Sequence, residues 1–288
     1  MPRCGEGSRR AGARRGRSDD DHRVQDYLDG EAAAGRHLVE TGELVAGSMS
    51  RAVAGLLFEP STAMVHLDER LAGCLRDAAI TAADLPLTWE RARAGAAVAF
   101  AAELAVTRTH QGRPVRTDGF FSVRSAARSA AERLIESTVQ AARGTTEERR
   151  VRHLGYLVAE VVVSPDIDPA LAHRALQLAE TCSWRQLAFL AAVGRRDRAP
   201  LPLAPLDDEP RGWRAWGARE DVVDLQRAGL LDPPPAVPRP GGAALPRLRP
   251  ADLRLTRRGV LVHRLLALDF VREDDVVAAI ADLGLPAA

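Results

Sequence analysis

The chain has 288 residues, of which 46% are hydrophobic, and its formal net charge at neutral pH is +1. This length allows one large domain or two small ones, and the apolar content suffices for a sizeable core. The small net charge excludes electrostatic steering of the whole molecule toward a polyanion. All 40 basic residues are arginine. Because this bias is typical of a GC-rich coding sequence, we predict a bacterial protein and do not take the number of arginines as a sign of nucleic-acid binding.

The composition and the spacing of apolar residues both favour helices. Aromatic residues make up only 4% of the chain, so its core must consist mainly of Ala, Leu and Val, of which Ala and Leu are strong helix formers. Residues 1–22 are rich in Gly, Arg, Ser and Asp, which predicts a disordered tail. From residue 23 on, apolar residues recur every three or four positions, which predicts a helical bundle over 23–182. The expected helices cover 26–59, 64–79, 88–106, 125–143 and 146–162, and a sixth begins at 169.

Local signals mark where several of these helices begin. Thr145 followed by Glu148 matches the capping box, in which the first side chain accepts from the backbone of the third helical residue. Ser183 followed by Gln186 matches the same pattern. Asp168 precedes a proline, and a capping Asp before Pro is a strong start signal.

The segment 111–122 reads QGRPVRTDGFFS and interrupts the helical pattern. Its Gly, Pro and Asp favour a loop, and one of the adjacent Phe120 and Phe121 is expected to anchor this loop to the core. We favour a surface turn held by one phenylalanine. The alternative is that Arg113 and Arg116 face an anionic ligand in a site assembled by the bundle.

The last third of the chain is organised differently. Four prolines in 199–210 predict a rigid linker. Trp213 and Trp216 lie three residues apart on one face of the helix that follows, and we expect them to dock this part of the chain onto the bundle. The expected elements are a helix over 213–228, a Pro- and Gly-rich segment over 233–242, a strand over 253–256, a helix over 257–268 and a final helix over 273–283.

The order of these elements resembles that of winged helix-turn-helix domains. The helix over 213–228, with Gly-Leu-Leu at its end, is followed by a loop, by a short strand that ends at Thr256 and by a further helix. The resemblance covers residues 183–268. It implies that 183–193 corresponds to the first helix of the domain, 221–231 to the recognition helix and its exit, 253–256 to the second strand of the wing and 257–268 to the helix that follows.

The resemblance implies a basic wing that contains Arg247, Arg249 and Arg254. An arginine-lined ribbon can hold phosphate groups. The candidate recognition helix carries as many acids as arginines, whereas a helix that enters a DNA groove normally presents a basic face. Winged helices without a basic recognition helix more often serve protein interaction or dimerisation.

The sequence contains no motif typical of a nucleotide, metal or covalent-catalysis site, such as a P-loop, HExxH or GxSxG. The three cysteines lie far apart, which predicts neither a zinc site nor a disulfide framework and favours a reducing compartment. The most apolar segment, 94–106, is shorter than the about 20 residues that a membrane crossing needs. His153 and His173 lie on consecutive expected helices, and we expect both at the surface. We predict no metal and no cofactor.

We therefore predict an all-α protein with a tail over 1–22, a multi-helix bundle over 23–182 and a small winged-helix-like module with a short β-ribbon over 183–288. The favoured function is non-enzymatic: a cytoplasmic regulatory or interaction protein that binds a protein partner or itself. Contact with DNA through the basic wing is a further option, and no membrane association is expected. The alternative is an enzyme or effector whose site lies near the loop 111–122.

Overall fold

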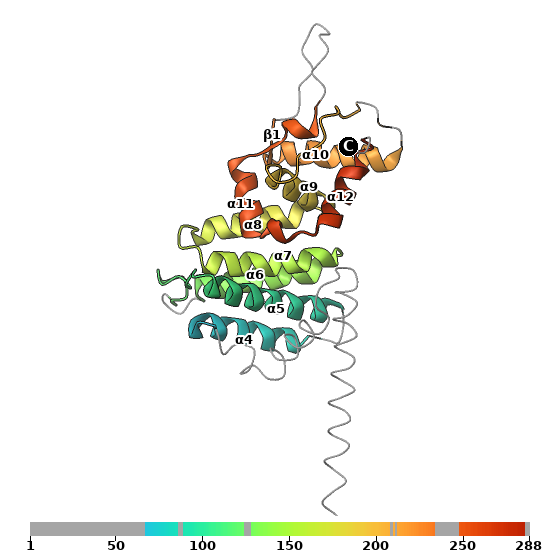
Figure 1. Cartoon of the computed structure of the whole chain (residues 1–288). Helices are drawn as coiled ribbons and strands as arrows, with labels where there is room; N and C mark the ends of the chain where they lie inside the picture. The colour runs from blue at the N-terminus through green and yellow to red at the C-terminus, as the bar shows by residue number, and fades with distance from the viewer. Residues whose placement is uncertain are drawn as a thin grey trace, which may run out of the picture.

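The computed structural model describes residues 67–85, 89–123, 128–207, 210, 212–233 and 248–285. In this part of the chain the protein is all-α, as predicted, with nine α-helices and one sheet of two short strands (Figure 1). The tail expected over 1–22 and the helix expected over 26–59 lie outside the described residues. Among the described helices, none combines the length and the apolar character that a membrane crossing requires.

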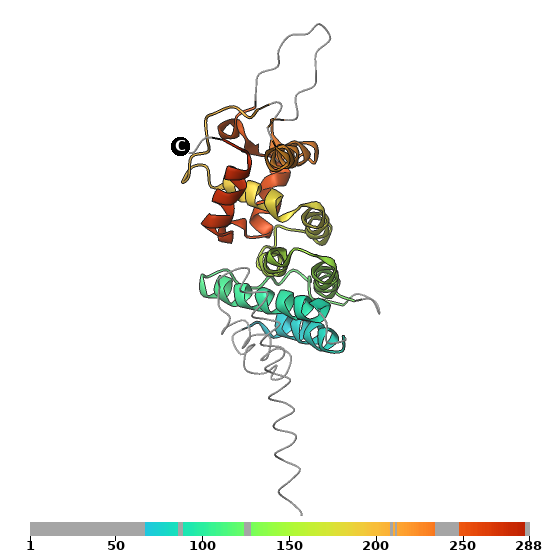
Figure 2. The same cartoon turned by 90° about the vertical axis from the view of Figure 1, so that its right-hand side faces the viewer.

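The first half is a stack of helices, with α4 (Glu69–Ala83) and α5 (Trp89–His110) at one end and α6 (Ala130–Gly144) and α7 (Glu148–Val162) above them (Figure 2). α5 is rich in alanine, and most of these alanines are buried. α5 and α7 approach so closely that a Cβ at Gly155 would lie 2.4 Å from the backbone oxygen of Ala97. Small side chains therefore set the spacing between these two helices.

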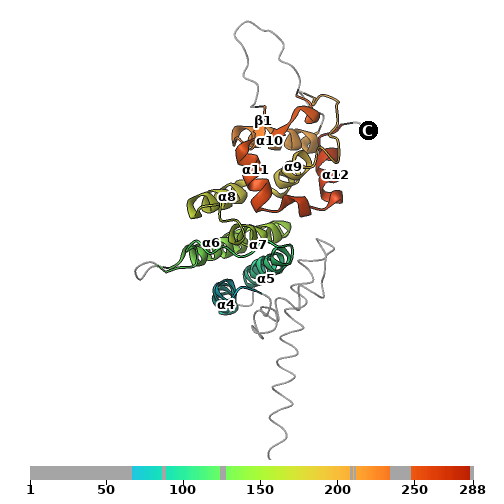
Figure 3. The same cartoon turned by 60° about the vertical axis from the view of Figure 1, so that its left-hand side comes forward.

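The second half continues the stack through α8 and surrounds α9, whose residues from Leu187 to Val193 are all buried (Figure 3). Its two strands pair antiparallel, with Leu231 opposite Leu255 and Asp232 opposite Arg254. One continuous hydrophobic core runs from Leu71 in α4 to Leu283 after α12. The elements are α8 (Pro169–Thr181), α9 (Trp184–Gly194), α10 (Trp213–Arg227), β1 (Leu231–Asp232), η1 (Pro250–Asp252), β2 (Arg254–Leu255), α11 (Arg257–Leu265), η2 (Leu268–Phe270) and α12 (Glu273–Asp282).

Two of the three helix starts marked in the sequence are confirmed. The Asp168 carboxylate accepts from the Leu171 backbone N–H at 2.7 Å, and Ser183 and Gln186 form both hydrogen bonds of a capping box. The capping box expected at Thr145 is wrong. α7 begins two residues later, after Glu147, and the Thr145 hydroxyl instead accepts from the Glu147 backbone N–H at 3.2 Å.

Candidate functional site

The arginines predicted for the wing are only partly described. Arg247 lies outside the described residues. Arg249 forms an ion pair with Asp252, its Nε lying 2.8 Å from the carboxylate. Arg254 donates from Nη1 to the backbone oxygens of Ala251 at 2.6 Å and Leu253 at 2.8 Å. Arg249 and Arg254 are both exposed, but each guanidinium already has an acceptor within its own segment.

The candidate recognition helix, α10, has no arginine surplus on its surface. Arg227 pairs with Asp224 at 3.1 Å, and Arg219 lies 3.6 Å from Glu220. Arg214 pairs with Asp282 of α12 at 2.7 Å. Because each of these cations has a carboxylate partner, α10 offers little charge for the phosphate contacts that dominate DNA affinity.

The loop 111–122 is held against the bundle by the residues that the sequence singled out. The Phe120 side chain is buried, as expected for the anchoring phenylalanine. The Arg116 guanidinium is buried as well, lies 4.5 Å above the Phe120 ring and donates to the Ile167 backbone oxygen at 2.7 Å. Asp118 accepts from Arg116 Nε at 2.8 Å, and this hydrogen bond holds the pKa of the Asp118 carboxyl below its usual value. Arg116 therefore stabilises the loop.

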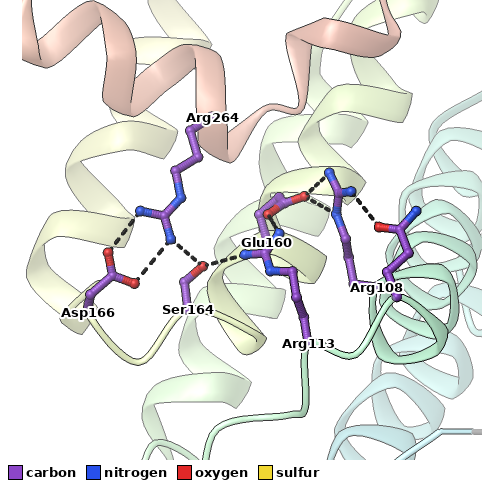
Figure 4. A network of polar contacts seen from close by, with 7 residues as sticks. Arg108, Arg113, Glu160, Ser164, Asp166 and Arg264 are labelled. Carbon is purple, nitrogen blue, oxygen red and sulfur yellow. Dashed lines mark hydrogen bonds and ion pairs between the residues drawn. The ribbon is translucent and has the colours of Figure 1, made fainter.

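A chain of polar contacts extends from this loop across the end of α7 (Figure 4). The Glu160 side chain is only 1% exposed and accepts from Arg108 Nε at 2.5 Å and from Arg113 Nη1 at 2.8 Å. Arg113 also donates to the Ser164 hydroxyl at 3.1 Å. A buried carboxylate is tolerated only with partners of this kind, so Glu160 ties the loop to α7.

The same network reaches α11 of the second half. Arg264 donates to Ser164 Oγ at 2.9 Å and to both oxygens of Asp166 at 2.8 and 3.1 Å. These hydrogen bonds lower the pKa of the Asp166 carboxyl and raise that of the Arg264 guanidinium. The network therefore connects α11 in the second half to α7 and the loop in the first half. We refer to its side chains as the clamp: Arg108, Arg113, Glu160, Ser164, Asp166 and Arg264.

The clamp lacks the features of an acid–base or nucleophilic site. Catalysis of that kind needs a proton acceptor of tuned pKa within reach of the reacting group. Asp166 is kept ionised by Arg264, and Ser164 Oγ accepts from two guanidinium groups, Arg113 and Arg264, instead of donating to a base. These hydrogen bonds hold the loop, α7 and α11 together.

Neither a metal cluster nor a reactive thiol occurs among the described residues. That part of the chain contains no group of three His, Cys, Asp or Glu side chains that could hold a metal ion. Burial raises the pKa of both Cys74 and Cys182 to about 11, so both thiols stay protonated and unreactive at neutral pH.

The expectation that Trp213 and Trp216 dock the second half onto the bundle is wrong. The Trp213 side chain is 85% exposed and that of Trp216 is 48% exposed. Their rings contact each other edge to face, with centroids 5.9 Å apart. The spacing of the two tryptophans predicts their shared face, but only the packing of α10 against α9 and α12 shows that this face is left uncovered.

His153 is also not at the surface, where the sequence places it. Its side chain is 2% exposed and lies between Tyr156 and Trp184, with ring centroids 5.7 and 5.5 Å away. The signal that could have found it is its helix face: Leu157 and Glu160, four and seven positions further along α7, are buried too.

The chain was compared with protein-family models, with curated proteins and with solved structures, and no match was found in any of the three comparisons.

Proposed function

We propose that the protein is a non-enzymatic regulatory protein of the cytoplasm that binds a protein partner through the exposed tryptophan pair of α10. The observation that carries the proposal is the exposure of Trp213 and Trp216 on a helix whose arginines are paired with carboxylates. The position of β1 and β2 between α10 and α11 supports the winged-helix-like reading of this half. Winged helices without a basic recognition helix commonly bind proteins.

The chemistry of the pair favours a protein surface as its ligand. Tryptophan is among the side chains that contribute most to protein–protein affinity, because a large and nearly rigid ring is buried at low entropic cost. A buried tryptophan covers about 150–250 Å². At about 25 cal/mol for each Å² of apolar surface, covering both rings contributes several kcal/mol. The edge-to-face contact holds the two rings in one arrangement before binding.

An experiment must distinguish the binding of a protein partner from the binding of DNA. The candidate DNA contacts are Arg247, Arg249 and Arg254. The test is binding of the purified protein to random-sequence duplex DNA at low and at moderate salt. We expect no binding, because the described arginines of the wing and of α10 have acceptors already. Tight binding that weakens steeply with salt and is lost in Arg249→Ala and Arg254→Ala variants would favour the DNA function instead.

The protein-binding proposal is tested by a photo-cross-linking amino acid placed at position 213 of the full chain, in cells of the source organism. We expect one discrete cross-linked protein, which is a second copy of this chain if the protein self-associates. The matched control places the same amino acid at Val260 of α11, which is 51% exposed and lies outside the pair. Equal cross-linking patterns at both positions would contradict the proposal.

A further inference from the structure

A groove of about 270 Å³ lies between α4 and α6, which pack against each other in the bundle. At about 30 Å³ for each water molecule, it has room for about nine of them. The helix that carries the tryptophan pair, α10, lies at the other end of the stack (Figure 1). Several side chains of the apolar floor are only partly buried, although they pack against the core. The floor consists of Cys74, Ala78, Ala82, Leu85, Ile135 and Val139.

The residues that line the groove follow one face of each helix. On α4 they recur at intervals of three or four positions from Cys74 to Leu85, and on α6 they recur in the same way from Glu132 to Arg143. Such spacing places side chains in line along a helix. At a rise of about 1.5 Å for each residue, both lines are about 16 Å long. A groove with two such walls is the kind of surface that binds an amphipathic helix.

Most of the charged side chains at the rim of the groove already have partners within the bundle. Arg128 pairs with Glu136, and Arg143 pairs with a glutamate of α5 at 3.0 Å. Glu132 belongs to the capping box that begins α6. Asp77 is exposed to solvent. Because these charges need no further partner, the groove offers its ligand mainly the apolar floor.

The chain itself contains a segment whose length and pattern match this groove. The described residues begin at Leu67, and the helix that the sequence predicts over 26–59 precedes them. The segment 45–57 would form about 18 Å of this helix. Its only charged residue, Arg51, lies away from the apolar face, so docking that face buries no charge. The apolar face consists of residues that recur every three or four positions: Val45, Met49, Val53 and Leu56.

We propose that the segment 45–57 of the same chain docks as a helix in the groove between α4 and α6, with its apolar face on the floor. Residues 58–68, which connect it to α4, can span at most about 36 Å. The near end of the groove, at Cys74, lies only about 8 Å along α4 from Glu69. A tethered segment reaches an effective concentration in the millimolar range, which a free partner helix must exceed. The proposal is independent of the tryptophan pair.

Disulfide trapping in the full-length protein tests the proposal. All variants carry Cys4→Ser, which removes the native cysteine that precedes the segment. A cysteine replaces Thr81, which is exposed and lies within the length of the groove, and a second one replaces Val45, Met49 or Val53 in turn. We expect at least one of these three pairs to form a disulfide within one chain under mild oxidation. Non-reducing gels give the rates, and mass spectrometry of the peptides identifies the pair.

Two matched controls separate docking from random collisions of a tethered segment. One moves the α4 cysteine to Ile80, which is 53% exposed but does not line the groove. The other moves the segment cysteine to Arg51, away from the apolar face. Both control pairs should react at least tenfold more slowly than the fastest test pair. Adding Leu56→Asp should slow that test pair at least tenfold, because docking would then bury a charge.

Three results would overturn the proposal. The first is that none of the three test pairs forms a disulfide, and the second is that a control pair reacts as fast as the fastest of them or that Leu56→Asp has no effect. The third is a disulfide between two chains, seen as a dimer on the gel. That result would show that the segment fills the groove of a second copy and not its own.

Discussion

At the scale of single residues, the burial of His153 makes the stability of the fold depend on pH. The folded state holds the pKa of this imidazole at about 4, below its ordinary 6.5. A group whose pKa is lowered by folding stabilises the native state fully above its unfolded pKa, and this stabilisation is lost as the pH falls from 6.5 toward 4. His263, whose pKa is also lowered by burial, acts in the same direction.

We therefore expect the free energy of unfolding to fall by about 2 kcal/mol between pH 6.5 and pH 5, since a tenfold change in proton affinity corresponds to about 1.4 kcal/mol. Urea unfolding at a series of pH values measures it. In a His153→Leu variant this dependence should become much shallower. An unchanged pH dependence in that variant would show that the buried imidazole is not its source.

Glu160 supports a second prediction at this scale. Its carboxylate is 1% exposed and accepts from Arg108 and Arg113. Replacing it by Ala leaves two arginines without their acceptor, and breaking a buried ion pair in this way typically costs about 3–5 kcal/mol. The control is Glu136→Ala, whose side chain is 52% exposed in its pair with Arg128 and should cost less than about 1 kcal/mol. Equal losses of unfolding free energy in both variants would refute the structural role of the clamp.

At the scale of elements, the close contact between α5 and α7 depends on a single glycine. A Cβ at Gly155 would lie 2.4 Å from the Ala97 backbone oxygen, which cannot move aside without shifting the helix. We expect Gly155→Ala to destabilise the protein by about 2 kcal/mol or more. Gly73, in the middle of α4, has open space where a Cβ would lie, so Gly73→Ala should stabilise it by about 0.5–1 kcal/mol. Thermal unfolding of the two variants should therefore shift in opposite directions.

The elements themselves could be predicted where the signal is local. Asp168 and Ser183 begin helices as the sequence indicates, because a capping side chain needs only the next three residues. Thr145 has the same local pattern but does not begin a helix. There α7 begins after Glu147. The Glu147 carboxylate accepts from the Trp184 backbone N–H at 2.9 Å. This contact with the first residue of α9 overrides the local preference for a helix start at Thr145.

The candidate sites could not be predicted in the same way, because they depend on contacts between distant positions. Arg264 and Ser164 are 100 positions apart in the sequence and meet only once α11 lies against α7 and α8. The alternative in which Arg113 faces an anionic ligand could not be decided from the sequence, and in the fold its partners are Glu160 and Ser164. The burial of His153 could be read only from the face of α7 that it shares with Leu157 and Glu160, and not from the residue type itself.

At the scale of the whole molecule, the bundle and the second half share one hydrophobic core and are joined by the clamp at Arg264. The outer surface of the second half nevertheless leaves Trp213 and Trp216 exposed on α10. Trp213 is the most exposed of the large apolar side chains in the described part of the chain, and its ring contact with Trp216 is consistent with a surface that a partner covers. A partner bound at this pair would therefore be the basis of its function.

The most direct test starts from the partner that is captured by cross-linking at position 213. Its affinity is measured by calorimetry for the full-length protein and for two variants. We expect Trp213→Ala to weaken binding at least about 30-fold, which corresponds to the 2 kcal/mol typical of a dominant interface residue. Trp89→Ala, which removes a tryptophan of similar exposure to Trp216 from the bundle, should leave the affinity within about twofold. An affinity unchanged by Trp213→Ala, or lowered equally by both substitutions, would contradict the assignment of the tryptophan pair as the binding surface.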